Sequence, residues 1–255
     1  MPISEDADGV LLSDGRGVPV ARFQWRVEDD ERVARLFQPS PGTPADRAAR
    51  LGVRELAGCR IKTNDEEAAR ALIGAGCTLV RAATDMHRGL HEPIPDPPLA
   101  DGWTITPHDW DDDLAVALAA AYGPDHPDRS DRVSRLRSLT EGEQGLVVLP
   151  GATARLKGPD GRSMGQVFTV GPVPWSGAPM SWVLDLAVTP GGQGRGFGAA
   201  LLAYAMSGTR QAGLTAVGLT VTDGNPARRL YDRMGFRPVV RYFEVRAPRP
   251  GAGRL

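Results

Sequence analysis

The sequence predicts an α/β protein with a central sheet and helices, and a second, smaller α/β domain at the N-terminus. Three features support this: apolar runs of strand length, apolar side chains at helical spacing between them, and a proline-rich segment dividing the chain. That segment, HEPIPDPP at 91–98, holds four prolines, each of which fixes its own φ and disfavours helix before it. We expect an N-terminal domain at 1–90, a linker at 91–101, a main domain at 102–247 and a tail at 248–255.

The composition excludes several classes of protein. With 30 basic and 31 acidic side chains the net charge is −1, so no overall field attracts nucleic acid or an anionic membrane. The hydrophobic fraction of 41% is typical of globular proteins. Cys59 and Cys77 form neither a CxxC pair nor a disulfide framework, which suits a reducing compartment and offers no zinc site. Because the start of the chain is acidic and the apolar runs fall short of the roughly 20 residues that span a bilayer, we expect a soluble cytoplasmic protein.

The main domain begins with a short strand near 103–106, followed by two helices. Apolar side chains from Leu114 to Tyr122 fall at helical spacing, and the second helix starts after Ser130. Four strands then follow, of which the first three form a meander and the last is a nearly continuous apolar run. These strands are expected at 146–149, 152–156, 164–170 and 182–188.

A glycine-rich turn, TPGGQGRGFG, joins the last of these strands to a helix. Five of the eight residues at 191–198 are glycine. Free backbone N–H groups and the positive end of a helix dipole meet at such a turn, so it predicts a pyrophosphate site. The alternative is a tight turn that needs positive φ. No lysine of a P-loop lies nearby, and too few residues follow for the rest of a dinucleotide-binding domain.

The chain continues with a strand at 217–222 and the run NPARRLYDRMGF. Asn225 can cap a helix there, and Gly235 can end it. A last strand is expected at 239–245.

The glycine turn resembles the GNAT superfamily of acyl-CoA-dependent N-acyltransferases. The run QGRGFG at 193–198 fits the Q/R-x-x-G-x-G/A signature, and the preceding LAVTP fits the end of that family's fourth strand. NPARRLYDRMGF looks like the family's late helix, and the resemblance covers about 102–246. It implies a GNAT fold with a mixed, mostly antiparallel sheet. It also implies transfer of an acetyl group from acetyl-CoA to a primary amine by direct attack in a ternary complex, with no metal.

The resemblance further implies which residues bind acetyl-CoA. The backbone of Leu186, Ala187 and Val188 would bond the pantetheine arm as an added strand, in a gap where two strands splay apart. Asn225 would lie near that arm, and Arg195 would flank the pyrophosphate. The turn residues expected at the cofactor are Gln193, Gly194, Arg195, Gly196, Phe197, Gly198 and Ala199.

Two side chains are candidates for proton transfer. The resemblance implies that Tyr231 protonates the leaving thiolate, and core packing is the alternative role. Many family members have a glutamate where this chain has Trp182, which leaves Asp185 as the only ionisable side chain on the strand. Asp185 is a candidate base or proton relay, or a buried structural aspartate. Alternation sends it to the face opposite Trp182 unless a bulge intervenes.

The acceptor-binding residues are expected in the loop between the first two helices. Asp125, His126 and Asp128 could bind a cationic amine there, or form a solvated polar turn. A small-molecule amine and a peptide amine both remain possible acceptors, and the protein could be a monomer or a homodimer. The alternative function is a non-catalytic acyl-CoA-binding or interaction protein.

The N-terminal part contains a faint repeat of the main domain. A shift of 159 residues places Gly76 on Gly235 and repeats a capped helix followed by a strand. Tyr231 then falls opposite Leu72, and no glycine turn able to bind pyrophosphate is present in this part. We expect either a degenerate second GNAT unit without catalysis or an unrelated α/β cap.

Overall fold

The computed structural model describes residues 3–6, 9–28, 31–122, 129–140 and 146–249. The chain forms two compact units. The N-terminal unit comprises Met1–Thr84, Thr222–Gly224 and Val239–Leu255, and the C-terminal unit comprises Asp85–Val221 and Asn225–Pro238. The sequence placed the division at 91–101, whereas the border between the units falls inside a strand, at Thr84 and Asp85. A strand that continues through the border leaves no break in the hydrophobic pattern.

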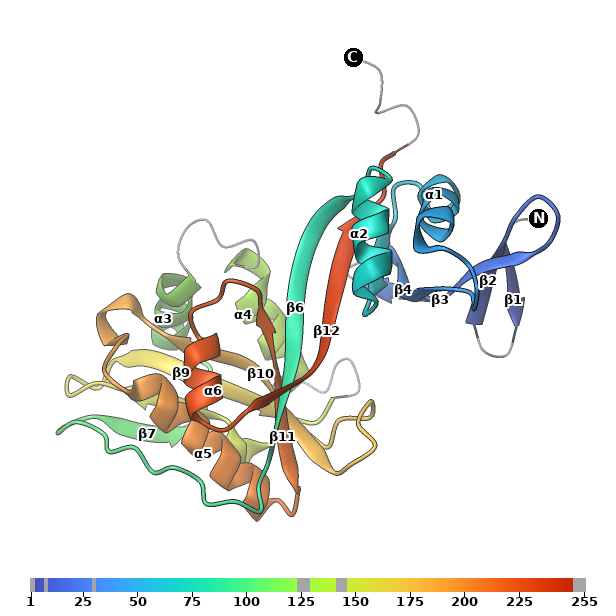
Figure 1. Ribbon diagram of the computed structural model, residues 1–255. Coiled ribbons are helices and arrows are strands. Elements are labelled where there is room, and N and C mark those ends of the chain that lie inside the picture. Colours follow the sequence, from blue (N-terminus) through green and yellow to red (C-terminus); the bar gives the residue numbers. More distant parts are fainter. Residues whose placement is uncertain (1–2, 7–8, 29–30, 123–128, 141–145, 250–255) are drawn as a thin grey trace. The chain divides into compact units, whose positions relative to one another are not determined.

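The strands of the C-terminal unit follow the order β6-β11-β10-β9-β8-β7 (Figure 1). Pairing is antiparallel from β7 to β10 and parallel between β10 and β11. The strands are β6 (Thr78–Gly89), β7 (Thr104–Pro107), β8 (Ala154–Lys157), β9 (Ser163–Val170), β10 (Met180–Val188) and β11 (Ala216–Thr222). The helices are α3 (Asp112–Tyr122), α4 (Arg129–Thr140), α5 (Phe197–Gln211) and α6 (Arg228–Arg233). Residues 146–149 form no strand, and Val148 makes only an isolated bridge with Val170.

Helices cover both faces of this sheet. The apolar face of α5 packs with Val183 of β10 and Leu219 of β11 in one core cluster. Leu136 and Leu139 of α4 pack with Trp182 of β10 in another. Trp182 and Val183, two successive residues of β10, therefore point to opposite layers, as in a strand covered on both faces.

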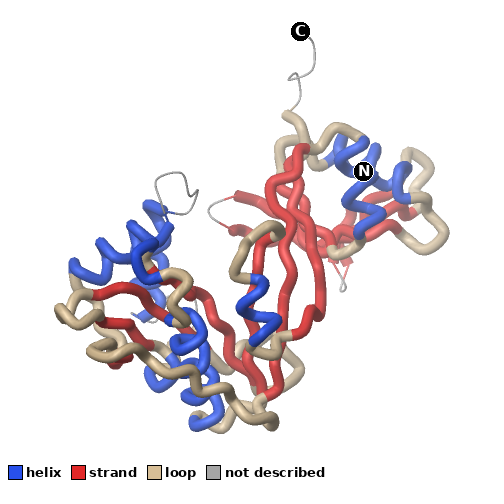
Figure 2. Tube along the Cα trace, turned by 60° about the vertical axis from the view of Figure 1, so that its left-hand side comes forward, coloured by secondary structure: helices blue, strands red, loops and turns tan. Residues whose placement is uncertain are grey.

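The N-terminal unit has the strand order β1-β2-β3-β4-β5-β12-β6. Its two helices, α1 and α2, both contribute side chains to the main core cluster of this unit. Figure 2 shows helices of this unit in blue beside its strands in red. Asp65 caps α2, because its carboxylate accepts hydrogen bonds from the N–H groups of Glu67 and Ala68. The elements are β1 (Ile3–Asp6), β2 (Gly9–Ser13), β3 (Pro19–Glu28), β4 (Glu31–Pro39), α1 (Ala45–Glu55), β5 (Arg60–Thr63), α2 (Glu66–Gly74) and β12 (Arg237–Arg246).

The internal repeat extends to topology. The series β3-β4-α1-β5-α2-β6 has the same order as β9-β10-α5-β11-α6-β12. In each series the first two strands are antiparallel, and the strand after the first helix runs parallel to the strand before it. The shift found in the sequence places α2 on α6, and Gly76 and Gly235 follow these helices with φ of +105° and +84°.

The equivalent strands β4 and β10 also share an irregularity. The register of β4 on β3 shifts between Arg22 and Gln24, and Leu36 of β4 has a φ of +55°. The register of β10 on β9 shifts between Val183 and Asp185. Each strand pairs with its parallel neighbour only before its own shift.

Gly218 of β11 tests the packing between β10 and β11. It lies beside Trp182 in the parallel register, and a Cβ there would clash with the indole ring. We expect Gly218→Ala to lower the free energy of unfolding by ~1–3 kcal/mol, measured by urea denaturation. The same Gly218→Ala change should cost less in a Trp182→Leu background, because the clashing ring is absent there.

Gly177→Ala is the matched control, since a Cβ at Gly177 meets no atom within 4 Å. We expect it to change the free energy of unfolding by less than ~0.5 kcal/mol. A Gly218→Ala variant as stable as the wild type would contradict the packing described here.

Candidate active site

The glycine turn adopts the left-handed conformations that favour glycine. Gly194 has a φ of +75°, and Gly196, the N-cap of α5, has a φ of +84°. A Cβ at either position would meet no atom within 4 Å. The positive φ values thus explain why glycine occurs at these two positions. The space into which their side chains would point is open as well.

The turn presents a group of backbone donors. The N–H of Ala199 donates to the carbonyl of Gly196 at 2.9 Å. Within the described part of the chain, the N–H groups of residues 194–198 have no backbone acceptor, and no side chain caps the start of α5. These five donors meet the positive end of the α5 dipole, which is favourable for an anion. Ala199, which was expected to contribute a donor, already uses its N–H inside the turn.

Two polar residues of the turn have defined positions. Gln193 donates from its amide nitrogen to the carbonyl of Val188 at 3.0 Å, which ties the turn to the end of β10. The guanidinium carbon of Arg195 lies 4.9 Å from the ring centre of Trp103 and 5.1 Å from that of Phe197. These rings hold the cation beside the start of α5. Trp103 was not among the residues predicted from the sequence.

Beyond its first residues, β10 has an open edge toward β11. The parallel pairing runs only from Met180 to Val183, opposite Ala216 to Leu219. On its other side, β10 continues to pair with β9 as far as Val188. The splay predicted from the resemblance is therefore present, and Leu186, Ala187 and Val188 lie on it. An extended ligand can add to such an edge as a strand would.

A β-bulge places Asp185 on the acceptor side of β10. Val183 pairs with Thr169 and Asp185 pairs with Phe168, so Leu184 is an extra residue. A bulge residue breaks the alternation of side chains. Asp185 consequently shares the α3–α4 face with Trp182, whereas uninterrupted alternation would have placed it on the opposite face.

The carboxylate of Asp185 is buried and surrounded by donors. Oδ1 accepts from the hydroxyl of Tyr122 and from Nε and Nη2 of Arg132, the latter two at 3.1 and 3.0 Å. Oδ2 accepts from the Gln166 amide at 2.6 Å. Burial acts to raise the pKa of Asp185, whereas the guanidinium of Arg132 and the hydrogen bonds on both oxygens favour the charged form, so the pair is ionised. The Asp185 side chain is only 1% exposed, so a proton would reach it only through its hydrogen-bonded neighbours.

Tyr231 of α6 is buried in the same cluster as α5. Its ring lies 6.1 Å from that of Phe236, in agreement with a packing role. Burial, and then the negative charge of Asp185, raise the pKa of Tyr231 to about 12. The phenol is thus protonated at neutral pH and able to donate a proton.

Of the remaining predicted residues, only Asn225 lies in the described part of the chain. Asn225 is exposed, and its side chain accepts from the N–H of Ala227 at 2.9 Å. The helix begins at Arg228 rather than at Pro226, because Asn225 forms a local turn before it. Asp125, His126 and Asp128 lie outside the described residues.

Sequence reasoning missed three of the partners of Asp185. Tyr122 and Arg132 come from α3 and α4, and their link to β10 has no local signal. Gln166 did leave a signal, since it is a fully buried amide within the apolar run of β9. A buried amide in such a run needs a polar partner.

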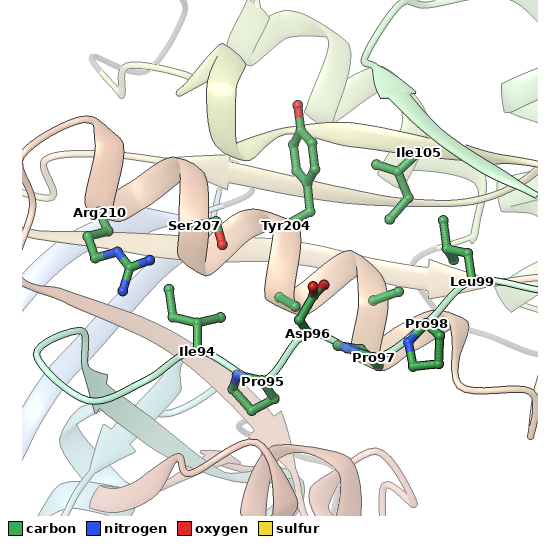
Figure 3. A pocket seen from close by; sticks show the side chains of 12 residues that line it. Ile94, Pro95, Asp96, Pro97, Pro98, Leu99, Ile105, Tyr204, Ser207 and Arg210 are labelled. Carbon is green, nitrogen blue, oxygen red and sulfur yellow. The ribbon is translucent and has the colours of Figure 1, made fainter.

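A separate cavity of about 580 Å³ lies along α5, beneath the segment Ile94–Leu99 (Figure 3). Small residues of α5 form its floor, and Tyr204 and Arg210 extend from the same helix. None of the predicted site residues lines it. Among the described residues no group of three potential metal ligands was found, and no helix is long and apolar enough to cross a bilayer.

Comparisons with known proteins agree with this geometry. The sequence model of the acetyltransferase (GNAT) family matches residues 159–236. The chain is 31% identical over 262 residues to a mycothiol acetyltransferase from Thermobispora bispora, which covers 91% of this chain and 88% of that protein.

Solved structures show the same fold. A GCN5-related N-acetyltransferase from Sphaerobacter thermophilus has a TM-score of 0.68 at 21% identity, over 95% of this chain and 81% of that one. A tandem GNAT protein from the clavulanic acid biosynthesis pathway has a TM-score of 0.55 at 16% identity, over 93% and 81%. The resemblance read from the turn and the late helix is confirmed, as is the predicted fold class. The chain belongs to the GNAT family of acetyltransferases and is an acyl-CoA-dependent N-acyltransferase.

Proposed function

We propose that the protein moves an acetyl group from acetyl-CoA to a primary amine by direct attack in a ternary complex. One observation carries this proposal: the open edge of β10 leads directly into a turn that presents five N–H donors at the start of α5. An extended arm with a pyrophosphate at its end has complementary groups for both parts. Acetyl-CoA has this construction.

The turn and the edge of β10 bind different parts of the cofactor. The pyrophosphate accepts from the N–H groups of residues 194–198, and Arg195 stands beside it. The pantetheine arm pairs with the backbone of Leu186, Ala187 and Val188, with Asn225 nearby. The thioester then lies at the splay, where strand N–H groups stabilise the developing oxyanion.

The proton transfers follow from the surroundings of Tyr231 and Asp185. The amine attacks in its neutral form, and Tyr231 donates its phenolic proton to the departing thiolate. The charge of Asp185 keeps that phenol protonated until the thiolate forms. Because the carboxylate is buried away from solvent, Asp185 serves as a relay rather than as the group that first takes the amine proton. Water carries that proton away from the amine, and water returns a proton to the Tyr231 phenolate before the next turnover. Positioning supplies much of the rate.

We place the acceptor among small-molecule amines, since the Thermobispora bispora relative is named for mycothiol, and keep peptide amines as the second possibility. His126 and Asp128, with Asp125, are the residues proposed to bind it on the sequence pattern alone. No metal takes part in the proposed reaction. A cytoplasmic monomer or homodimer is the proposed form of the enzyme.

The N-terminal unit is proposed to support the active unit without catalysing. Its counterpart of the glycine turn precedes α1, whose N-cap is Pro44, a residue with no N–H to donate. Asp46 adds a negative charge in the first turn of α1. Both features oppose the binding of a pyrophosphate.

A non-catalytic acyl-CoA-binding protein is the alternative function. It is favoured by Trp182 standing where many family members have a glutamate, and by the fully bonded carboxylate of Asp185. Tyr231 argues for the enzyme.

Gly196→Asp tests the pyrophosphate site. We expect acetyl-CoA affinity to fall by about a hundredfold, because a carboxylate would stand where the phosphates bind. Gly196→Asn is the matched control, since it has the same size and the same strain at positive φ without the charge. Calorimetric titration should show a smaller loss for asparagine, and equal losses for both variants would contradict an anion site at this turn.

Tyr231→Phe tests the catalytic role. We expect the rate of CoA release, followed with a thiol reagent over a panel of amines, to fall by about a hundredfold or more. The affinity for acetyl-CoA should stay the same, since the ring remains in the core. Unchanged turnover would remove Tyr231 as the acid and favour its packing role.

A further inference from the structure

Arg132 of α4 makes an unusual set of contacts with β10. Its Nη2 donates to the backbone carbonyl of Leu184 at 2.6 Å, and its Nε and Nη2 both reach Oδ1 of Asp185. Leu184 is the extra residue of the bulge, and Asp185 is the residue that follows it. One guanidinium therefore holds the main chain of the bulge and the next side chain together.

The surroundings make this contact strong. The side chain of Asp185 is 1% exposed and that of Arg132 is 24% exposed, so little water competes for their bonds. A planar guanidinium presents several donors in a fixed geometry, which suits two acceptors side by side. Tyr122 adds a hydroxyl bond to the same carboxylate oxygen, and its ring lies 5.6 Å from the guanidinium carbon.

Gln166 fixes the other carboxylate oxygen. Its amide nitrogen donates to Oδ2 of Asp185, while its amide oxygen is 2.9 Å from Nε2 of His108. Burial lowers the pKa of His108, so a neutral imidazole can donate to that oxygen and hold the amide in this orientation. The carboxylate is thus held from β9, α3 and α4 at once.

The position of the bulge decides where the edge of β10 opens. Pairing between β10 and β11 ends at Val183, the residue directly before Leu184. From there to Val188, β10 does not pair with β11, although the Val188 carbonyl accepts from Gln193. A carbonyl held by a side chain cannot turn back to accept from a neighbouring strand, so the contact with Arg132 opposes closure of the splay.

We propose that Arg132 is a positioning residue that locks the bulge at Leu184 and keeps the edge of β10 open for the pantetheine arm of acetyl-CoA. The inference rests on the proposed function, because it assigns that arm to β10. It gives Arg132 no contact with the reacting atoms. It also separates the two parts of the cofactor site: the arm depends on Arg132, and the turn at the start of α5 does not.

That separation supplies the test. We would titrate wild type, Arg132→Met and Arg132→Lys calorimetrically with acetyl-CoA and with 3′-phospho-ADP, the nucleotide part of the same molecule. Arg132→Met should bind acetyl-CoA about tenfold more weakly or worse, since the arm no longer meets a preorganised edge. Its affinity for 3′-phospho-ADP should match the wild type. Arg132→Lys should recover part of the affinity for acetyl-CoA, because an ammonium group can bond one of the two acceptors.

Arg137→Met is the matched control, an exposed arginine on the same helix. It should bind both ligands as the wild type does. Removing Arg132 alone leaves a buried charge without its counter-ion, which can unfold the domain. The double variant Arg132→Met with Asp185→Asn avoids this, and it should show the same selective loss of acetyl-CoA affinity.

The outcomes separate the two proposals. Failure of the wild type to bind acetyl-CoA would overturn the proposed function itself. A wild type that binds, together with folded Arg132 variants that bind acetyl-CoA equally well, would overturn the positioning role alone. Equal weakening of both ligands would also overturn it, because a general loss of structure explains that result.

Discussion

The ion pair between Asp185 and Arg132 is the contact on which the active-site geometry depends. It joins β10 to α4 at the one place where the strand gains an extra residue. The same bulge turns Asp185 toward α3 and α4, ends the pairing with β11, and sets a negative charge near Tyr231. The bulge in β10 thus determines which way Asp185 points, where the strand stops pairing with β11, and where the negative charge lies. The buried ion pair holds the bulge in place.

A buried charge is expensive unless it is well bonded, and this one is bonded on both oxygens. The donors to Asp185 come from α3, α4 and β9, so the bonds that satisfy its charge also connect these elements to β10. Their common effect is to fix the backbone on which an extended cofactor arm would lie. The glycine turn differs from Asp185, because the N–H groups of residues 194–198 have no backbone acceptor in the described chain. The space beside Gly194 and Gly196 is also open. An unpaired strand edge beside a turn of N–H donors is complementary to the extended arm and the pyrophosphate of an acyl-CoA.

Local features of the site could be predicted from the sequence, and non-local ones could not. The turn at 191–198 and the helix after Asn225 could be predicted from neighbouring residues alone, because positive φ and the Asn225 turn depend on short-range geometry. The placement of Asp185 depends on a bulge, for which β10 carries no sequence signal. Arg132 and Tyr122 meet Asp185 only after the helices fold onto the sheet. The division of the chain was placed at its prolines, yet the units divide inside β6, where the hydrophobic pattern is continuous.

The central claim is that the open edge of β10 and the glycine turn form one site for acetyl-CoA. Calorimetric titration of the full-length wild-type protein, with acetyl-CoA and NAD compared side by side, tests it most directly. We expect one molecule of acetyl-CoA to bind per chain with micromolar affinity, and NAD to give no heat. Binding of NAD, or no binding of acetyl-CoA, would contradict it and leave the turn as a structural feature of the strand-to-helix connection.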